Sequence, residues 1–256
     1  MNNITFIIPV RIDSHYRLRN LTSVLNFFLN SAQNTKFIIT EGDVSTKIET
    51  IPASERVCKL FRHDDNPIFH RTKYVNDVLR TLDDEIVAVW DCDAIGSFDN
   101  ISQAADMLSQ TEDVMAYPYN GIFWSVGEYH SELFSKSLDL RVLTDFPQPR
   151  ALMCGYHSVG GAFLVNVKRY KKYGWENEYF KGWGPEDAER YARLEILGKK
   201  PVRVDAELFH LYHTRGINSG TSDHGLAMST KKEYAHVCGM TSEELKEYIS
   251  TWNWIK

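Results

Sequence analysis

Cysteine is scarce in this chain and never occurs in a metal-binding pair. The 256 residues include only Cys58, Cys92, Cys154 and Cys238, which lie far apart and form no C-x-x-C pattern. This distribution favours reduced thiols in a cytoplasmic protein over a disulfide framework. Long apolar runs are also missing, and none approaches the length of a membrane span. Residues 1–10 predict a short strand, since they lack the basic start and long apolar centre of a signal peptide.

Positive charge is not concentrated anywhere along the chain. The net charge is −5 at pH 7, which gives no support for a nucleic-acid partner. The basic residues are scattered, so no transmembrane segment and no basic membrane patch is predicted, and only peripheral membrane contact stays open. Repeats, low-complexity segments and linkers are also lacking. The sequence therefore predicts a single domain over 1–256.

Apolar, β-rich segments alternate with amphipathic segments in the first half of the chain. Strands are predicted at 4–8, 36–40, 57–62, 85–90 and 114–117, and helices at 18–29, 71–82 and 101–109. This alternation favours an α/β fold with a mostly parallel central sheet and helices on both faces. Ligands bind such sheets beyond the carboxyl ends of the strands. The residues at those predicted ends are Pro9, Val10, Arg11, Glu41 and the run Asp91-Cys92-Asp93.

The second half of the chain is less regular. An aromatic loop is predicted at 119–126, a helix at 127–140, a strand at 160–167, and short strands at 201–204 and 207–211. Residues 214–229 are rich in Gly, Ser, Thr and Asn, which predicts a mobile loop. Thr241-Ser242-Glu243-Glu244 forms a capping box that predicts a C-terminal helix over 241–252.

Two aspartates follow the predicted strand 85–90. Asp91 and Asp93 lie two residues apart, so their side chains would point to one side of an extended chain. Two close carboxylates repel each other, and a divalent cation relieves that repulsion. The alternative is a solvated turn after a strand. The position of the pair at the ligand-binding edge of the sheet favours a cation site.

Two histidines supply a second group of metal ligands. His210 and His213 would face opposite ways on a straight strand, so joint ligation requires a turn at Leu211 and Tyr212. The alternative is two unrelated histidines at a strand end. Imidazole combined with carboxylate suits Mn²⁺ and similar ions better than Ca²⁺. The two clusters together predict a metalloenzyme with open positions for a diphosphate.

A third motif combines glycines, an indole and two carboxylates. It reads Gly182-Trp183-Gly184-Pro185-Glu186-Asp187. Proline suits the first position of a helix, which is predicted over 185–197, and carboxylates are stabilised in a helix's first turn. Trp183 offers a flat apolar face on which a sugar ring can pack. The alternative is an ordinary helix start beside a buried tryptophan.

These segments, in this order, resemble the GT-A glycosyltransferases, in particular the β-1,4-galactosyltransferase group and its bacterial capsule-synthesis relatives. The resemblance extends from Ile4 to about His213. The segments that carry it are Pro9-Val10-Arg11, Phe69-His70-Arg71-Thr72-Lys73, Asp91-Cys92-Asp93, Gly160-Gly161 and Gly182-Trp183-Gly184-Pro185-Glu186-Asp187. His213 falls where the family has its metal histidine, and His210 where the family can have methionine.

The resemblance implies a GT-A fold and transfer of a hexose or N-acetylhexosamine from a UDP-sugar to a saccharide hydroxyl. It further implies inversion and a role in bacterial surface-polysaccharide synthesis. Mn²⁺ or another divalent cation would bind Asp93, His210 and His213, and Asp187 would be the catalytic base. Contacts with donor or acceptor are implied for Pro9, Val10, Arg11, Asp13, Glu41, Phe69, Arg71, Asp91, Ser158, Gly160, Gly161, Trp183 and Glu186.

One position bears on the donor sugar. Galactose-specific members of the family have a tyrosine two residues before the glycine pair, beside C2 of the sugar. This chain has Ser158 there. The smaller side chain leaves room for an N-acetyl group, so the resemblance implies that UDP-GalNAc, or another UDP-N-acetylhexosamine, is used at least as well as UDP-galactose.

The chain also departs from the family pattern. Ala188 interrupts the family's run of acids, and Asp13 replaces a second basic residue near the start. The family's membrane anchor and stem are not recognisable, which suggests a cytoplasmic bacterial enzyme. Three alternatives stay open: a retaining enzyme similar to the polypeptide N-acetylgalactosaminyltransferases, which have a related W-G-x-E motif, a non-catalytic sugar-binding protein, and a metal-dependent hydrolase.

Overall fold

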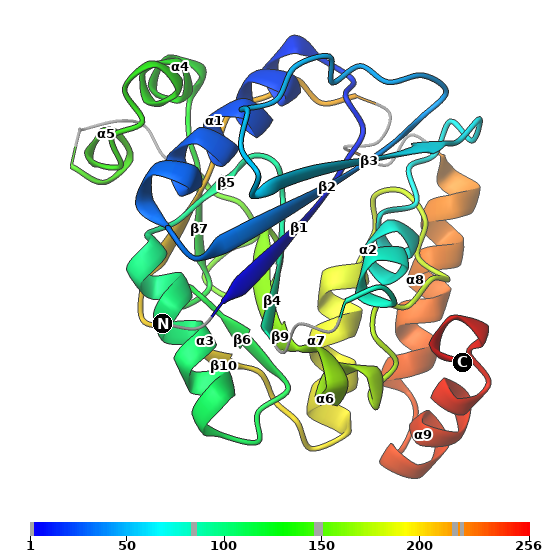
Figure 1. Ribbon diagram of the computed structural model, residues 1–256. Helices are drawn as coiled ribbons and strands as arrows, with labels where there is room; N and C mark the ends of the chain where they lie inside the picture. Colours follow the sequence, from blue (N-terminus) through cyan, green and yellow to red (C-terminus); the bar gives the residue numbers. More distant parts are fainter. Residues whose placement is uncertain (1–2, 83–85, 146–150, 217–219, 221–222) are drawn as a thin grey trace.

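The main sheet has seven strands in the order β10-β6-β9-β4-β1-β2-β3. The computed structural model describes residues 3–82, 86–145, 151–216, 220 and 223–256 (Figure 1). The strands of this sheet are β1 (Ile4–Val10), β2 (Thr35–Asp43), β3 (Val57–His63), β4 (Ile86–Trp90), β6 (Met115–Tyr117), β9 (Ala162–Asn166) and β10 (Val202–Arg203). Strands β3, β2, β1 and β4 pair in parallel, whereas β9 is antiparallel to both β4 and β6. The predicted α/β fold with a mostly parallel sheet is confirmed.

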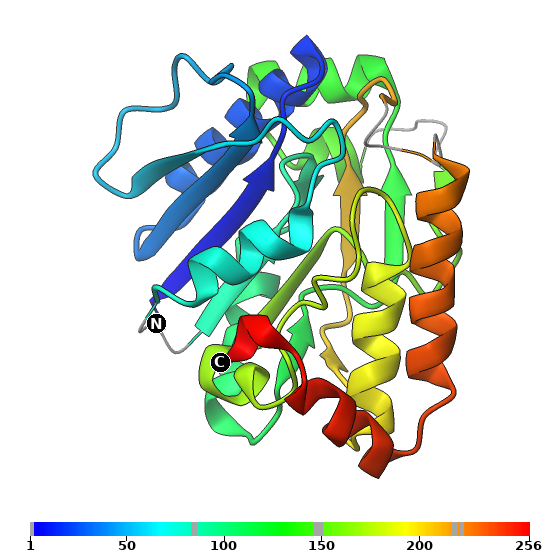
Figure 2. The same ribbon diagram turned by 90° about the vertical axis from the view of Figure 1, so that its right-hand side faces the viewer.

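Helices cover both faces of this sheet. Figures 1 and 2 show α1 (His15–Ser31) and α3 (Phe98–Gln110) on one side, and α2 (Arg71–Leu79) and α7 (Glu186–Ile196) on the other. The whole of β1 is buried, as its apolar sequence predicts. Phe6 of β1 packs against Phe28 of α1 and Trp90 of β4, with ring centroids 5.2 and 5.5 Å away. Buried apolar side chains from Ile4 to Leu211 form one continuous cluster.

A second, smaller sheet was not predicted. Its four strands are β5 (Ala94–Ile95), β11 (Glu207–His210), β7 (Ile122–Ser125) and β8 (Ala151–Leu152), in that order. The prediction of a loop at 119–126 is therefore wrong, because β7 lies within it. Short strands of this kind are stabilised by pairing with distant segments, here β11, and local sequence carries no trace of such a partner.

The C-terminal part of the chain is helical. Helices α8 (His224–Cys238) and α9 (Ser242–Ser250) are followed by the short 3₁₀ segment η2 (Asn253–Ile255). The predicted C-terminal helix and its capping box are confirmed, because the side chains of Thr241 and Glu244 each bond the other's backbone N–H. The remaining helices are α4 (Glu128–Ser137), α5 (Arg141–Thr144) and α6 (Val167–Lys171). None of the helices in the described part of the chain combines the length and the apolar character needed to cross a membrane.

The predicted loop at 214–229 is partly wrong. Residues 224–229 form the first turns of α8, which begins where the side chain of Asp223 accepts a hydrogen bond from the backbone of Leu226. Residues 217–219 and 221–222 of the predicted loop lie outside the described residues. Gly225 and Ser229 are weak helix formers, so the helix depends on packing. Thr230 of α8 lies against Gly184, within 3.1 Å of where a Cβ would be.

Candidate active site

One cavity of about 470 Å³ lies beyond the carboxyl ends of β1 and β4. All but one of the predicted site residues line it. These lining residues are Pro9, Val10, Arg11, Asp13, Phe69, Arg71, Asp91, Asp93, Ser158, Gly160, Gly161, Trp183, Glu186, Asp187, His210 and His213. The fold thus brings together residues from six separate segments of the sequence, as expected of a ligand site at this edge.

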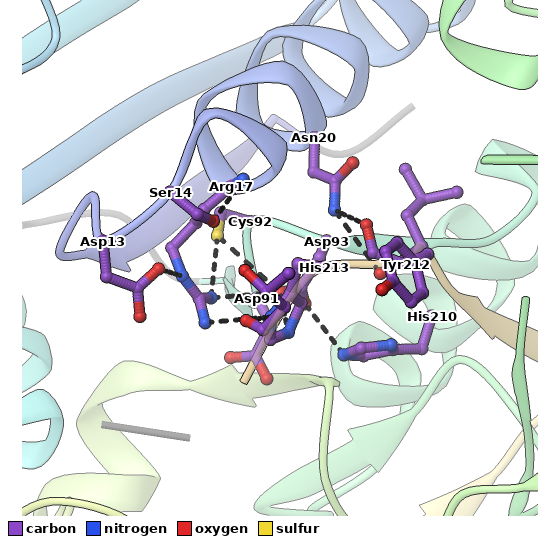
Figure 3. Close-up of polar contacts among 12 residues, drawn as sticks. Asp13, Ser14, Arg17, Asn20, Asp91, Cys92, Asp93, His210, Tyr212 and His213 are labelled. Atoms are coloured by element: carbon purple, nitrogen blue, oxygen red, sulfur yellow. Dashed lines mark hydrogen bonds and ion pairs between the residues drawn. The ribbon is translucent and has the colours of Figure 1, made fainter. Parts of the chain in front are cut away.

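Asp93, His210 and His213 form a compact cluster (Figure 3). Each offers one ligand atom, and these atoms all lie within 4.8 Å of one another. Nε2 of His213 lies 3.3 Å from one carboxylate oxygen of Asp93, and Nε2 of His210 lies 3.7 Å from the other. Antiparallel pairing of β5 with β11 sets Ala94 opposite His210, and the backbone N–H of Leu211 donates to the carbonyl of Asp93. The unpredicted second sheet therefore assembles this cluster.

The chain beyond β11 returns His213 to the cluster. The carbonyl of Tyr212 accepts hydrogen bonds from Asn20 and Arg19, at 3.1 and 3.0 Å, and its backbone N–H donates to the Ser131 hydroxyl at 2.8 Å. Nδ1 of His213 lies 2.8 Å from the carbonyl oxygen of Thr214, which can only accept, so Nδ1 is the donor in this contact. Nε2, the other ring nitrogen, faces Asp93.

The cluster fits a divalent transition-metal cation. It combines one carboxylate oxygen donor with two imidazole nitrogen donors, a set suited to Mn²⁺ and its neighbours. Burial lowers the pKa of His210, which favours the neutral imidazole that a metal requires. The hydrogen bond from His213 to a backbone carbonyl is the usual outer contact that orients a metal-binding histidine.

Asp91 does not join this cluster. Strand β4 ends at Trp90, and the backbone N–H of Ala94 bonds back to the carbonyl of Asp91, so the chain turns between the two aspartates. The expectation that extended backbone directs both carboxylates to one side is therefore wrong. Asp91 instead pairs with Arg71, whose guanidinium lies 2.8 Å from its carboxylate. Arg71 thus balances the charge of Asp91.

The motif at the start of α7 forms another part of the cavity wall. Pro185 is the residue before the helix rather than its first residue, and Glu186 and Asp187 open the helix. Trp183 is 52% exposed, so the alternative of a buried tryptophan is wrong. Burial, reinforced by the charge of Asp187, raises the pKa of Glu186 to about 8. Oε2 of Glu186 is buried without a hydrogen-bond partner among the described residues.

Asp187 is held by a buried arginine. Nη2 of Arg190 lies 2.9 Å from Oδ1 of Asp187 and 2.8 Å from Glu176, while Nε of Arg190 donates to Glu176 at 2.7 Å. Arg71 lies 3.8 Å from Glu176, so Glu176 lies between the arginines that pair with Asp187 and Asp91. Burial opposes ionisation of Glu176, but Arg190 outweighs it and lowers the pKa to about 2. The network keeps Glu176 ionised.

The two glycines before β9 are each explained by a different physical constraint. Gly161 has a positive φ of 82°, and a Cβ there would lie 2.6 Å from the ring of Phe123. Gly160 has no unusual φ, but a Cβ on it would lie 2.7 Å from Oδ2 of Asp187. The carbonyl of Gly160 accepts a hydrogen bond from Tyr119 at 2.6 Å, and the carbonyl of Gly161 accepts one from the backbone of Asp91 at 2.9 Å. Only glycine lets this loop approach Asp187.

Glu41 is the predicted site residue that does not line the cavity. Its side chain is fully buried, and its carboxylate accepts hydrogen bonds from the hydroxyl of Thr46 and the backbones of Lys47 and Ile48. The expectation that Glu41 contacts the nucleotide is therefore wrong, because β2 continues to Asp43 and Glu41 lies inside it. Its carboxylate fixes the chain after β2.

Arg11 and Phe69 lie together on another wall. The guanidinium of Arg11 lies 5.5 Å from the ring centroid of Phe69 and donates to the carbonyls of Gly42 and Asn66, at 2.6 and 2.7 Å. Arg11 thus fixes the loop that presents Phe69 while itself lining the cavity.

Three basic lining residues were not predicted from the sequence: Arg17, His157 and Arg215. Arg17 pairs with Asp13 at 3.0 Å and with Asp93 at 3.1 Å. Arg17 lies four residues after Asp13, just before the predicted helix 18–29, and an acid–base pair at this spacing was the one signal that could have drawn attention to it. His157 and Arg215 lie outside predicted elements, and no spacing marks them.

The chain is similar to a known family and to several solved structures. Residues 144–215 match a family model described as the N-terminal domain of galactosyltransferase. The catalytic domain of Drosophila beta1,4-galactosyltransferase 7 in complex with xylobiose has a TM-score of 0.55 and 14% identity, over 95% of this chain and 84% of that one. No curated protein matches the chain in sequence.

Two further solved structures are similar. Glucosyl-3-phosphoglycerate synthase from Mycobacterium tuberculosis, in complex with Mn²⁺, UDP-glucose and phosphoglyceric acid, has a TM-score of 0.58 and 13% identity, over 93% of this chain and 80% of that one. GalNAc-T7 with UDP, GalNAc and Mn²⁺ has a TM-score of 0.59 and 12% identity, over 96% of this chain and 50% of that one.

At these identities the structures define the fold, which is that of the GT-A glycosyltransferases. Within that class the chain resembles the galactosyltransferases, whose family model matches the stretch that holds Gly160, Asp187 and His213. The family match and the fold together support a glycosyltransferase.

Proposed function

We propose that this protein is a metal-dependent, inverting glycosyltransferase that moves a hexose or N-acetylhexosamine from a UDP-sugar to a saccharide hydroxyl. One observation carries the proposal. A single cavity holds the Asp93, His210 and His213 cluster together with a carboxylate, Asp187, that no metal ligand contacts among the described residues. Displacement at an anomeric carbon needs both charge neutralisation at the leaving group and a proton acceptor at the nucleophile.

The metal cluster is assigned to the leaving group. Asp93, His210 and His213 would hold Mn²⁺ or another divalent cation, which when bound neutralises negative charge on the departing diphosphate. Three protein ligands leave further coordination positions open for diphosphate oxygens. Mn²⁺ occurs together with UDP-glucose in the mycobacterial synthase and with UDP in GalNAc-T7.

Asp187 is assigned as the base that accepts the proton of the acceptor hydroxyl. The ion pair with Arg190 holds its carboxylate on one side, and Gly160 lies close to it on the other. Trp183 presents an exposed indole beside it for the apolar face of a sugar. Glu186, whose raised pKa keeps much of its carboxyl protonated near neutral pH, would donate a hydrogen bond to a sugar oxygen through its unpartnered Oε2.

The donor sugar is assigned from Ser158. Its backbone is held in place, since its N–H donates to the carbonyl of Gly121 at 3.0 Å and its carbonyl accepts from Arg203 at 3.0 Å. A small side chain at this fixed position leaves room beside C2 of a sugar bound against Gly160 and Gly161. UDP-GalNAc or another UDP-N-acetylhexosamine is therefore the proposed donor, with UDP-galactose the competitor.

A biological setting follows from the resemblance to capsule-synthesis enzymes. We place the protein in the cytoplasm of a bacterium, in surface-polysaccharide synthesis, as one domain that contacts membranes at most peripherally. A non-catalytic sugar-binding protein has no need of the Asp93 cluster. A metal-dependent hydrolase would need further ligands near Asp91, which pairs with Arg71 instead. A retaining reaction is separated from inversion by NMR of the product's anomeric centre.

Thermal unfolding with a panel of nucleotide sugars tests the proposal, because a ligand that binds only the folded state raises the midpoint. UDP-sugars should raise it in the presence of Mn²⁺ and much less in the presence of a chelator. GDP-sugars serve as the matched control. A panel in which no UDP compound shifts the midpoint, with or without Mn²⁺, would refute the proposed function.

A further inference from the structure

Arg17 lines the cavity and has no role in the reaction proposed above. It lies near the start of α1, which begins where the Ser14 side chain accepts a hydrogen bond from the backbone of Arg17. Its guanidinium extends from the helix into the cavity, between Asp13 and Asp93 (Figure 3). Nε lies 3.0 Å from Oδ1 of Asp13, and Nη1 lies 3.1 Å from Oδ2 of Asp93.

The oxygen of Asp93 that Arg17 contacts also faces the metal-binding nitrogen of His213. Oδ2 of Asp93 lies 3.3 Å from Nε2 of His213 and 3.1 Å from Nη1 of Arg17. A cation held between that oxygen and that imidazole would therefore lie beside a permanent positive charge. A guanidinium cannot lose its proton at accessible pH to relieve the repulsion.

Other charges around Arg17 do not remove this conflict. Asp13 pairs with Arg17 on the side away from the cluster, and Asp91 is already engaged by Arg71. Asp93 is thus the acidic residue for which Arg17 and a divalent cation compete, among the residues that the structure describes around the cluster. Arg215 also lines the cavity and adds positive charge. With a cation bound, the site would have an excess of positive charge, which an anion would neutralise.

We infer that Arg17 makes cation binding depend on diphosphate binding, an inference that rests on the proposed function. Without nucleotide, Arg17 competes with the cation for Asp93 and weakens cation binding. With nucleotide, the diphosphate supplies the missing negative charge, and the guanidinium donates hydrogen bonds to it as arginine does to phosphate. Cation and nucleotide then strengthen each other's binding, which is a coupling free energy between two ligands. Arg17 is a positioning residue for the leaving group.

Electron paramagnetic resonance of Mn²⁺ measures the coupling directly, because free and protein-bound Mn²⁺ have different spectra. Mn²⁺ is titrated into the 256-residue protein with and without saturating UDP, for wild type, Arg17→Met, Arg17→Lys and Asp93→Asn. Arg141→Met is the matched control, since Arg141 is an exposed arginine of α5 that pairs with Asp139. Thermal unfolding of each variant checks the fold, and Arg17→Lys, which keeps the charge, serves if Arg17→Met is unstable.

Removing the charge of Arg17 should strengthen Mn²⁺ binding in the absence of UDP and reduce the effect of UDP on Mn²⁺ binding. Arg17→Met should bind Mn²⁺ alone at least about threefold more tightly than wild type, while the factor by which UDP tightens Mn²⁺ binding should fall about tenfold, within the range typical of coupled sites. Arg17→Lys should fall between the two, and Arg141→Met should match wild type. A residue that merely shapes the metal site would weaken Mn²⁺ binding when removed.

Two results would overturn the inference. In the first, Arg17→Met binds Mn²⁺ as weakly as wild type or more weakly. In the second, UDP tightens Mn²⁺ binding by the same factor in both proteins. Failure of the proposed function is a distinct outcome, in which wild type and Asp93→Asn bind Mn²⁺ alike and UDP has no effect on either.

Discussion

Gly160 and Asp187 are so close that a single added carbon on the glycine would lie 2.7 Å from the carboxylate oxygen Oδ2. The contact joins the loop before β9 to the first turn of α7. It explains why a glycine is needed at a position whose backbone conformation other residues could adopt. The carboxylate is therefore fixed from two sides, by Gly160 and by Arg190.

Gly160→Ala should lower turnover by roughly 10- to 100-fold, because a displacement of about 1 Å at a reacting group is enough for such a loss. UDP and Mn²⁺ binding should change little. Gly127→Ala is the control, since a Cβ there meets nothing within 4 Å. Steady-state kinetics with a responsive acceptor give the comparison. Wild-type turnover in Gly160→Ala would show that the contact does not position Asp187 for catalysis.

Asp187→Asn should reduce turnover by about a hundredfold or more, the scale expected for loss of a general base. The amide keeps the shape of the carboxylate, so the fold and the binding of UDP with Mn²⁺ should be preserved. Calorimetric titration of UDP and thermal unfolding check those two properties beside the kinetic assay. If turnover stays near that of wild type, another group accepts the proton.

Because of Glu186, the free energy of unfolding should fall as the pH rises from about 4.5 to about 8. Its pKa is about 8 in the folded protein against an ordinary 4.5, first because of burial and then because of Asp187. A raised carboxyl pKa contributes stability that is fully present below about 4.5 and is lost as the pH rises through about 8. Glu186→Gln removes this loss, so its free energy of unfolding relative to wild type should rise between pH 5 and pH 8.5.

Urea unfolding at those two pH values measures the effect of Glu186→Gln. Glu195→Gln is the matched control, because Glu195 lies on the same helix and pairs with Lys200 at the surface. The Glu186 assignment is wrong if the stability difference between Glu186→Gln and wild type is the same at both pH values.

Ser158→Tyr should shift donor choice toward UDP-galactose. The ratio of kcat/KM for UDP-GalNAc to that for UDP-galactose should fall by roughly 10- to 200-fold, the span of one pocket substitution. Wild type should use UDP-GalNAc at least as well as UDP-galactose. A strong wild-type preference for UDP-galactose that the tyrosine leaves unchanged would mean that Ser158 does not approach C2 of the sugar.

The main sheet was predictable from the sequence because its strands carry their own signal. Strand β1 is buried along its whole length, and all but one of its residues are apolar. Strand β7 has four residues and depends on pairing with β11, far away in the chain, so no local pattern reveals it. Helix α8 was not predicted for a similar reason. Gly225 and Ser229 are typical of a loop, and the helix is stabilised instead by packing of α8 against α7 and the loop at Gly184.

The site was predictable where residue type alone limits the chemistry, as for Asp93, His213 and Asp187. The hydrogen-bond and ion-pair partners of the site residues were not predictable. Asp91 turned out to be the partner of Arg71, and Glu41 to be a buried acceptor for the backbone after β2. Arg17 was missed because an arginine near a helix start is common, and only the folded chain places it against Asp93.

The central claim is that Asp93, His210 and His213 bind a cation that holds the diphosphate. Calorimetric titration of UDP in Mn²⁺ and in a chelator, for wild type, Asp93→Ala and His213→Ala, tests it most directly. Wild type should bind UDP at least about tenfold more tightly with Mn²⁺, within the usual range of coupled ligands, and both variants should bind equally weakly in either buffer. Wild-type affinity for UDP in the chelator, or an undiminished Mn²⁺ effect in both variants, would contradict the claim.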